Sequence, residues 1–316
     1  MVGPSALALF SSRRDHWRRD RRGRYLDSVQ TRTTRDSYAE TLARLTALAG
    51  ERPAAALVPE DYAAVMDRWD AAAAATWNRH LSALTSFTAW AGQQEILATN
   101  PGRRLERRKP ARRGDRSIPR ARLDKLFTDD RHGLRERVLW RTLYETAARA
   151  EELLSLKPED LDLEFRCGRV TSKGGATQYV HWATGTDRLL PRLLRGRTSG
   201  PLFLADRRAP AAGPLVPVVA DVCPVTGRGR LSYPRAEYPF KQATAALDPH
   251  DTGWDLHQLR HSALQHLAVD GRTAPELQVK SRHLHLGSLG RYVQLGEQTS
   301  AQVAADADPA ARRRTR

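Results

Sequence analysis

The second half of the chain gathers arginine, lysine, histidine and tyrosine into a few short segments. They are ETAARAEELLSL at 145–156, SKGG at 172–175, HQLRHS at 257–262 and SRHLHLGSLGRY at 281–292. Cleaving a phosphodiester without a metal ion requires a nucleophile for phosphorus, fixed cations for the non-bridging oxygens and an acid for the leaving oxygen. These segments contain residue types suited to each role, so they predict phosphodiester chemistry.

The four segments resemble, in order, the sequence boxes of the tyrosine recombinases, the family of phage integrases. ETAARAEELLSL resembles the first box, usually TGxRxxELLxL, and places the box arginine at Arg149. HQLRHS resembles the HxLRHS/T box and gives His257 and Arg260. SKGG is similar to the lysine-bearing β-hairpin of the family and gives Lys173. The resemblance covers most of residues 30–295.

The last segment resembles the closing box, in which a histidine precedes the nucleophilic tyrosine by nine residues. Counting back from Tyr292 selects His283 rather than His285. Two positions depart from the family pattern, because Ala147 and Arg282 stand where glycine is commoner. Neither departure removes a side chain that the chemistry needs.

The resemblance implies a role for each residue. Tyr292 attacks the scissile phosphate and forms a 3′-phosphotyrosyl intermediate. Arg149 and Arg260 hold the non-bridging oxygens. Lys173 is the expected general acid for the leaving 5′ oxygen, and His257 helps to move the tyrosine proton.

Three further residues are expected to assist. The resemblance implies that His283 hydrogen-bonds the phosphate. Glu152 follows Arg149 by three residues, which places the two on one face of a helix, so Glu152 could orient Arg149. His261 adjoins Arg260 and is expected to support it.

Each residue also has an ordinary structural interpretation when it is taken alone. Arg149 and Glu152 could form a surface ion pair, Lys173 could be an exposed turn residue, and Tyr292 could be half-buried. His257 and His261 are four residues apart and could share a metal ion, but no HExxH motif or cysteine partner completes such a site, so we expect no metal. The ordered set of segments favours catalysis.

The charge of the chain indicates a polyanionic partner. The net charge is +16, and the sequence pI is about 10.6. Most of the excess lies in residues 1–30, in RRLERRKPARRGDR at 103–116 and in RRRTR at the end. Such segments can contact DNA phosphates, although charge runs are often only solvated linkers or tails. For 103–116 we favour the DNA role, and for the two termini both interpretations stay open.

Candidate DNA contacts come from two places. A predicted helix with Trp77, Leu81, Leu84, Phe87 and Trp90 on its apolar face carries polar residues on its other side. Those residues could also be an ordinary solvated face. The candidates are Arg79 and Ser82 on this helix, and Arg107, Arg108, Lys109, Arg112 and Arg113 in the basic segment.

The periodicity predicts a mainly α protein with a small β-hairpin or sheet (α+β). We expect a basic arm at 1–30, a helical core-binding domain at 31–102 and a basic linker at 103–116. A tyrosine-recombinase-like catalytic domain at 117–316 follows. It holds a Pro- and Gly-rich surface loop or insertion around 200–238 and a C-terminal tail at 293–316, which in the family often packs on a neighbouring subunit.

Several classes are not expected. No glycine-rich phosphate loop is present, so we expect no nucleotide cofactor and, with the metal set aside above, no cofactor at all. Cys167 and Cys223 lie outside any CxxC pair, which suits a reducing compartment. No apolar run approaches the roughly 18 residues of a membrane span. We therefore expect a cytoplasmic, nucleoid-associated protein without a membrane partner.

The resemblance implies a site-specific recombinase, with integration of a mobile element favoured. Its expected partners are double-stranded DNA, three further copies in a homotetramer on synapsed sites, and an excision or accessory DNA-bending factor. Two alternatives remain at this point. One is a DNA-binding accessory protein without catalysis, and the other is a type IB topoisomerase that relaxes supercoils alone.

Overall fold

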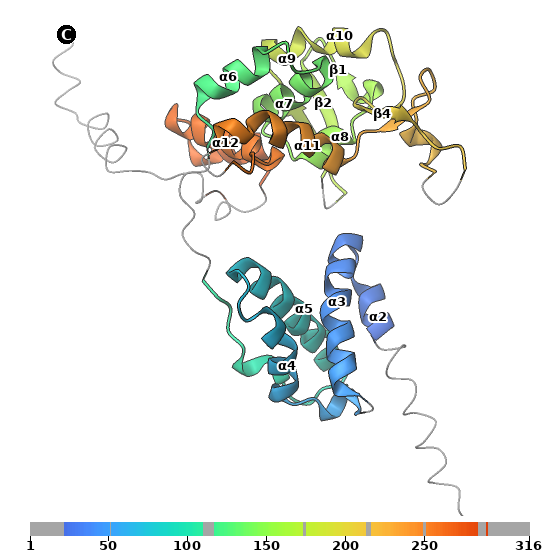
Figure 1. Cartoon of the computed structure of the whole chain (residues 1–316), viewed down its shortest axis with the longest axis vertical. Helices are drawn as coiled ribbons and strands as arrows, with labels where there is room; N and C mark the ends of the chain where they lie inside the picture. The colour runs from blue at the N-terminus through green and yellow to red at the C-terminus, as the bar shows by residue number, and fades with distance from the viewer. Residues whose placement is uncertain are drawn as a thin grey trace, which may run out of the picture. The chain divides into compact units, whose positions relative to one another are not determined.

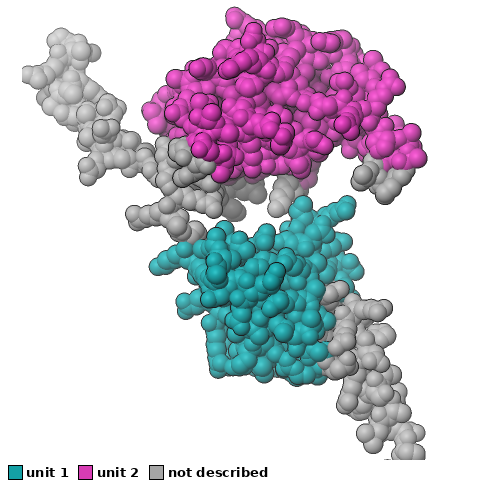
Figure 2. Space-filling model, viewed as in Figure 1, with its two compact units in different colours: residues 1–114 teal, residues 115–316 magenta. Residues whose placement is uncertain are grey.

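The computed structural model describes residues 22–50, 52–109, 117–172, 175–212, 216–248 and 251–283, together with Leu289. Two compact units divide the chain, one formed by residues 1–114 and the other by residues 115–316 (Figure 2). Within the described residues, no helix is long and apolar enough to cross a membrane.

Unit 1 is a helical bundle (Figure 1). Gly50, at φ 61°, ends its first long helix, and Pro59 occupies the first turn of the next. Its elements are α2 (Arg22–Ser28), α3 (Arg32–Ala49), α4 (Pro59–Met66), α5 (Ala74–Gln93) and short 3₁₀ turns at Ala54–Ala56, Asp67–Trp69 and Pro101–Arg104.

The core of unit 1 includes the apolar helix face that the sequence predicts. Trp77, Leu81, Leu84 and Phe87 of α5 are buried in one cluster with residues of α3 and α4. Their spacing of three and four residues places them on one side of the helix. The other side of α5 is left to polar residues.

Unit 2 is built around α7, which contacts α6, α10, α11 and α12 (Figure 1). Val138, Leu139, Trp140 and Leu143 of α7 are all buried in the main core. Its helices are α6 (Arg120–Thr128), α7 (Leu134–Thr146), α8 (Ala150–Leu154), α9 (Thr184–Asp187), α10 (Leu190–Leu194), α11 (Tyr233–Thr244), α12 (Leu256–Val269) and α13 (Ala274–Ser281), with 3₁₀ turns at Pro158–Asp160, Val219–Asp221 and Ala245–Leu247.

The described residues of unit 2 also form two small antiparallel sheets. β1 (Leu161–Asp162), β2 (Cys167–Thr171) and β3 (Thr177–His181) form the first, in that order. The pairing of Thr171 with Thr177 closes a hairpin in which Gly175 has φ 81°. A left-handed residue at that point requires glycine, so the predicted hairpin is confirmed. The predicted mainly α fold with a small sheet is confirmed as well.

The stretch 200–238 is not a loop without regular structure. β4 (Leu204–Arg208) pairs with β5 (Arg228–Arg230), and α11 begins at Tyr233. Leu202, Phe203 and Leu231 are buried. The expectation of a surface loop was wrong for these residues, because two short arginine-rich strands show no alternation of apolar and polar residues.

Two helices of unit 2 end at a left-handed residue although the apolar periodicity of the sequence continues past that point. The helix from Leu134 does not run on through ETAARAEELLSL, because Ala147 adopts the left-handed conformation and ends α7. The helix in APELQVKSRHLHL ends at Ser281, with Arg282 left-handed. Both breaks occur where the family commonly has glycine.

Candidate active site

Arg149 lies in a short connection between α7 and α8. Ala147, at φ 49° and ψ 30°, turns the chain, and Arg149 is extended at the N-cap of α8. The Ala148 N–H donates to the Thr146 hydroxyl at 3.2 Å. Arg149 therefore lies just before a helix rather than within one, unlike the helical placement that its spacing to Glu152 predicts.

Glu152 holds Arg149 by two hydrogen bonds. The Arg149 backbone N–H donates to Glu152 Oε2 at 2.9 Å, and Nη1 donates to Oε1 at 2.8 Å. The side chain of Glu152 is only 5% exposed, whereas that of Arg149 is 41% exposed. The carboxylate thus fixes one edge of a guanidinium whose remainder is accessible, which suits the binding of an incoming phosphate.

Glu152 has a second partner, the buried side chain of Arg282, which the sequence did not indicate as part of the site. Its Nη2 lies 2.6 Å from Glu152 Oε2, and its side chain is 6% exposed. Its backbone is left-handed, at φ 58° and ψ 36°. The departure from glycine was the available signal, but sequence alone did not reveal a carboxylate 130 residues away as its partner.

The two arginines decide the ionisation of Glu152. Burial by itself would raise the pKa of this carboxyl, but the Arg282 guanidinium and the hydrogen bonds from Arg149 hold the pKa below its usual value. Glu152 is therefore an anion at neutral pH, so it can neutralise part of the surrounding positive charge.

Arg260 is the most buried of the site residues, with 1% exposure. From α12 it donates through Nη1 to the Ala147 carbonyl and through Nη2 to the Ser281 carbonyl at 2.7 Å. Ala147 directly follows α7, and Ser281 is the last residue of α13. One guanidinium thereby holds together the two breaks in the helices that flank the site.

His283 adjoins this guanidinium. Its Nε2 lies 3.3 Å from Arg260 Nη2, and its Nδ1 lies 2.6 Å from the Ser281 hydroxyl. A guanidinium can only donate, so Nε2 accepts and a proton on Nδ1 satisfies the second contact. The Gln278 amide donates to the His283 carbonyl at 3.0 Å, which fixes the backbone here.

Of the remaining predicted site residues, two histidines of α12 are described by the structure and three residues are not. His257 is exposed in the first turn of α12, one turn before Arg260, and His261 is half-buried next to Arg260. The structure thus brings Arg149, Glu152, Arg260 and His283 together. Lys173, His285 and Tyr292 lie outside the described residues.

The first part of the predicted linker is docked on α5 of unit 1. Asn78 accepts from the Arg108 N–H at 2.9 Å and donates to the Arg108 carbonyl at 2.8 Å. The Trp77 indole donates to the Glu106 carbonyl at 3.0 Å, and Arg107 donates to the Ser82 hydroxyl at 2.8 Å. Two of the candidate DNA contacts, Ser82 and Arg107, are therefore neighbours.

Arg108 differs from the other basic candidates. Its guanidinium pairs with Asp70 and stacks over the Trp77 ring at 3.7 Å. Arg79, Arg107 and Lys109 are exposed. The tail 293–316, most of the arm 1–30, Arg112 and Arg113 lie outside the described residues.

No three His, Cys, Asp or Glu side chains gather into a metal-binding group in the part of the chain that the structure describes. The site assembled above consists instead of arginines, one buried carboxylate and histidines.

Both units match known protein families. The model described as phage integrase family matches residues 120–299, and that of the phage integrase N-terminal SAM-like domain matches residues 24–95. The chain is 31% identical over 254 residues to the tyrosine recombinase XerC of Mycobacterium sp. (strain KMS), covering 75% of this chain and 80% of that one. Against XerC of Staphylococcus carnosus (strain TM300) it is 27% identical over 242 residues, with 75% and 77% covered.

Solved structures share the fold. The Tn1549 transposon integrase, in complex with a circular intermediate DNA, matches with a TM-score of 0.66 at 14% identity, over 92% of this chain and 99% of that one. A lambda integrase dimer bound to a core site matches with a TM-score of 0.65 at 15% identity, over 88% and 95%. The chain belongs to the phage integrase family and is a tyrosine-type site-specific recombinase, an enzyme that breaks and rejoins DNA.

Proposed function

We propose that Tyr292 is the nucleophile of this recombinase and that Arg149, Arg260 and His283 bind the phosphate it attacks. The observation that carries the proposal is the guanidinium of Arg260, which touches both the carbonyl of Ala147, next to the Arg149 loop, and the ring of His283. Two cations and a histidine from three distant segments therefore meet, as stabilising a phosphorane requires.

The remaining chemistry belongs to residues whose roles rest on the family resemblance. The Tyr292 oxygen bonds to phosphorus as its proton leaves, with His257 helping the transfer. The bond from phosphorus to the 5′ oxygen breaks, and Lys173 supplies a proton to that oxygen. Religation reverses these steps with a 5′-hydroxyl of the partner strand. The phosphotyrosine conserves the bond energy, so no nucleotide is consumed.

Packing near the nucleophile supports this assignment. Leu289, three residues before Tyr292, is buried in a small cluster with Ala147, Leu264 and Leu277. Ala147 is the residue whose carbonyl Arg260 holds. Leu289 therefore packs against the same connection that presents Arg149.

The proposed partner is double-stranded DNA. Arg79 and Lys109 are exposed, as is Arg107 beside Ser82, and together they suit a phosphate backbone. The relatives include a lambda integrase dimer on a core site and a XerH recombinase on its difH substrate. We further propose that four copies of the chain assemble on two synapsed DNA sites in the cytoplasm, at the nucleoid. The tail 293–316 would join neighbouring copies. An excision or DNA-bending factor would set the direction of recombination.

A nicked suicide duplex that carries the attachment site tests the proposal. The wild-type protein should form a heat-stable adduct with the 3′ end, and Tyr292→Phe should form none. Tyr238→Phe is a matched control, because Tyr238 lies exposed on α11, and it should react normally. A Tyr292→Phe protein that still forms the adduct contradicts the proposal. Plasmid relaxation without any joining of two sites would favour the topoisomerase alternative.

A further inference from the structure

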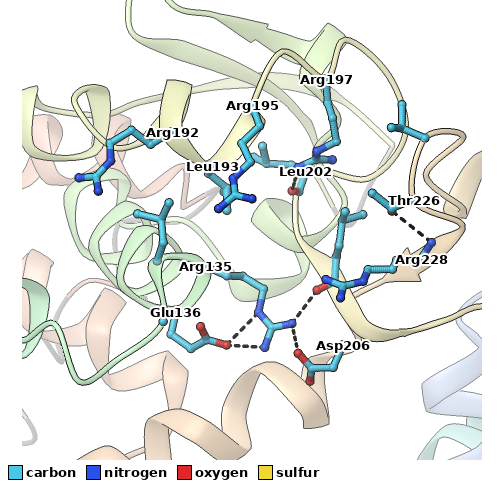
Figure 3. Close-up of a pocket in the computed structure, with 14 residues that line it drawn as sticks. Arg135, Glu136, Arg192, Leu193, Arg195, Arg197, Leu202, Asp206, Thr226 and Arg228 are labelled. Carbon is cyan, nitrogen blue, oxygen red and sulfur yellow. Dashed lines mark hydrogen bonds and ion pairs between the residues drawn. The ribbon is translucent and has the colours of Figure 1, made fainter.

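We propose that unit 2 has a second anion site, a pocket that binds a small phosphorylated ligand of nucleotide size. The pocket has a volume of about 620 Å³ and lies between the start of α7, the end of α10, β4 and the turn before β5 (Figure 3). We call it the arginine pocket after the five arginines that line it, Arg135, Arg192, Arg195, Arg197 and Arg228.

Two of the five arginines bond to other groups of the protein. Arg135 forms ion pairs with Glu136 and, at 2.7 Å, with Asp206. Arg197 donates to the carbonyls of Pro201 and Leu202 at 2.8 and 3.0 Å. Arg135 thus pairs with both carboxylates that line the pocket, Glu136 and Asp206, while Arg197 is held by two backbone carbonyls.

The other three arginines supply charge that no carboxylate compensates. Arg192, Arg195 and Arg228 are exposed, and their guanidinium groups take part in no ion pair among the described residues. In Figure 3, Arg195 and Arg228 point into the space above Arg135 from two different segments. Guanidinium groups that converge in this way match the oxygens of a phosphate.

The backbone at Arg195 gives an independent reason to assign a role to this side chain. Arg195 is left-handed, at φ 50°, at the end of α10, and Gly196 follows with φ 77°. Glycine would occupy position 195 without strain, whereas a larger residue there carries a conformational cost. The arginine is therefore not required by the turn, which favours a use for its guanidinium.

The shape and the apolar lining of the pocket select a compact ligand. Leu134, Leu193 and Val225 line it beside the arginines. Its volume falls in the range of roughly 300–1,000 Å³ typical of small-molecule sites, which is too small for a duplex. Apolar residues next to several cations suit a molecule that joins phosphates to a flat, weakly polar ring, as a nucleoside diphosphate does.

The arginine pocket is separate from the recombination site. It includes Gly133 and Leu134 at the beginning of α7, whereas Arg149 follows the end of that helix. A helix of 13 residues spans about 20 Å. Binding in the pocket can therefore be lost while the phosphotyrosine chemistry is kept.

Isothermal titration of the full chain with ADP, without magnesium, tests the proposal, with adenosine and pyrophosphate as partial ligands. ADP should bind saturably, adenosine should not, and pyrophosphate should compete. Replacing two of the three uncompensated arginines, in Arg195→Gln/Arg228→Gln, should weaken ADP binding by at least about tenfold. The matched control is Arg207→Gln, an exposed arginine of β4 outside the lining, and it should bind normally.

Duplex binding and suicide-substrate cleavage by the same variants separate this site from the recombination site. Both should be unchanged in Arg195→Gln/Arg228→Gln, and its thermal unfolding should match that of the wild type. Failure of ADP to bind saturably overturns the proposal, and so does equal binding by the double variant. Loss of duplex affinity in the double variant without ADP binding would assign these arginines to DNA instead.

Discussion

Arg282 and Glu152 form an ion pair of 2.6 Å between side chains that are 6% and 5% exposed, and Glu152 also holds Arg149 at 2.8 Å. Removing two charges from water is costly, so such a pair is stable only when both partners are present. The pair fixes Glu152, and Glu152 in turn orients the more accessible guanidinium of Arg149. Arg282 is thus a positioning residue, acting on the phosphate-binding arginine through a carboxylate.

Arg282→Gly restores the residue commoner in the family but should harm this protein. Relief of the left-handed conformation should gain about 1 kcal/mol. Removing the Arg282 guanidinium from the buried Glu152 carboxylate should cost about 3 kcal/mol or more even though Arg149 remains, so the free energy of unfolding should fall. Cleavage of the suicide duplex should slow as well, because Arg149 loses its fixed support. Denaturant unfolding and single-turnover cleavage measure the two effects.

The control is the double variant Arg282→Gly/Glu152→Gln, in which the buried position 152 no longer carries a charge. It should recover part of the lost stability but not the cleavage rate. If Arg282→Gly is as stable and as fast as the wild type, the pair has no positioning role.

The acid side of the stability profile should depend on Glu152. Its pKa is lower in the folded protein than the usual value, so its contribution is complete above the unfolded pKa of about 4.3. That contribution is lost as the pH falls through the folded pKa. The difference in stability between wild type and Glu152→Gln should therefore shrink below about pH 4.3. A constant difference down to lower pH would contradict the depressed pKa.

Arg260→Lys should lower the cleavage rate by about a hundredfold or more. An ammonium is a compact donor that cannot span the Ala147 and Ser281 carbonyls as the planar guanidinium does. The measurement is single-turnover cleavage, with thermal unfolding recorded in parallel. A lysine variant with near-normal cleavage would show that charge alone is needed at this position.

Arg107 and Arg108 should behave differently in DNA binding. Arg107→Ala removes an exposed cation, so the slope of log K against log salt should become shallower by about one. Arg108→Ala should leave that slope nearly unchanged and destabilise unit 1, because its guanidinium pairs with Asp70 and stacks on Trp77. Equal slope changes for the two variants would contradict this division.

The sequence predicted the features that depend on local patterns. The buried face of α5 and the hairpin at Gly175 follow from side-chain period and turn chemistry. The same patterns could not show that Ala147 and Arg282 are left-handed, since periodicity continues across both breaks. Nor could they reveal β4 and β5, whose pairing depends on partners some twenty residues apart rather than on alternation.

Local sequence patterns also predicted only part of the candidate site. The nine-residue spacing from His283 to Tyr292 is visible in the chain, and so is the spacing of Arg149 to Glu152. The contact of Arg282 with Glu152 joins α13 to α8, and only the packed fold brings these segments together. Long-range pairs of this kind are set by tertiary structure.

The role of Tyr292 is tested most directly by identifying the residue that becomes linked to DNA. The adduct with the suicide duplex is digested with protease and nuclease, and the peptide that retains a nucleotide is sequenced by mass spectrometry. We expect a phosphotyrosine at Tyr292, attached to the 3′ side of the cut. A nucleotide on any other residue, or on the 5′ side, would contradict it.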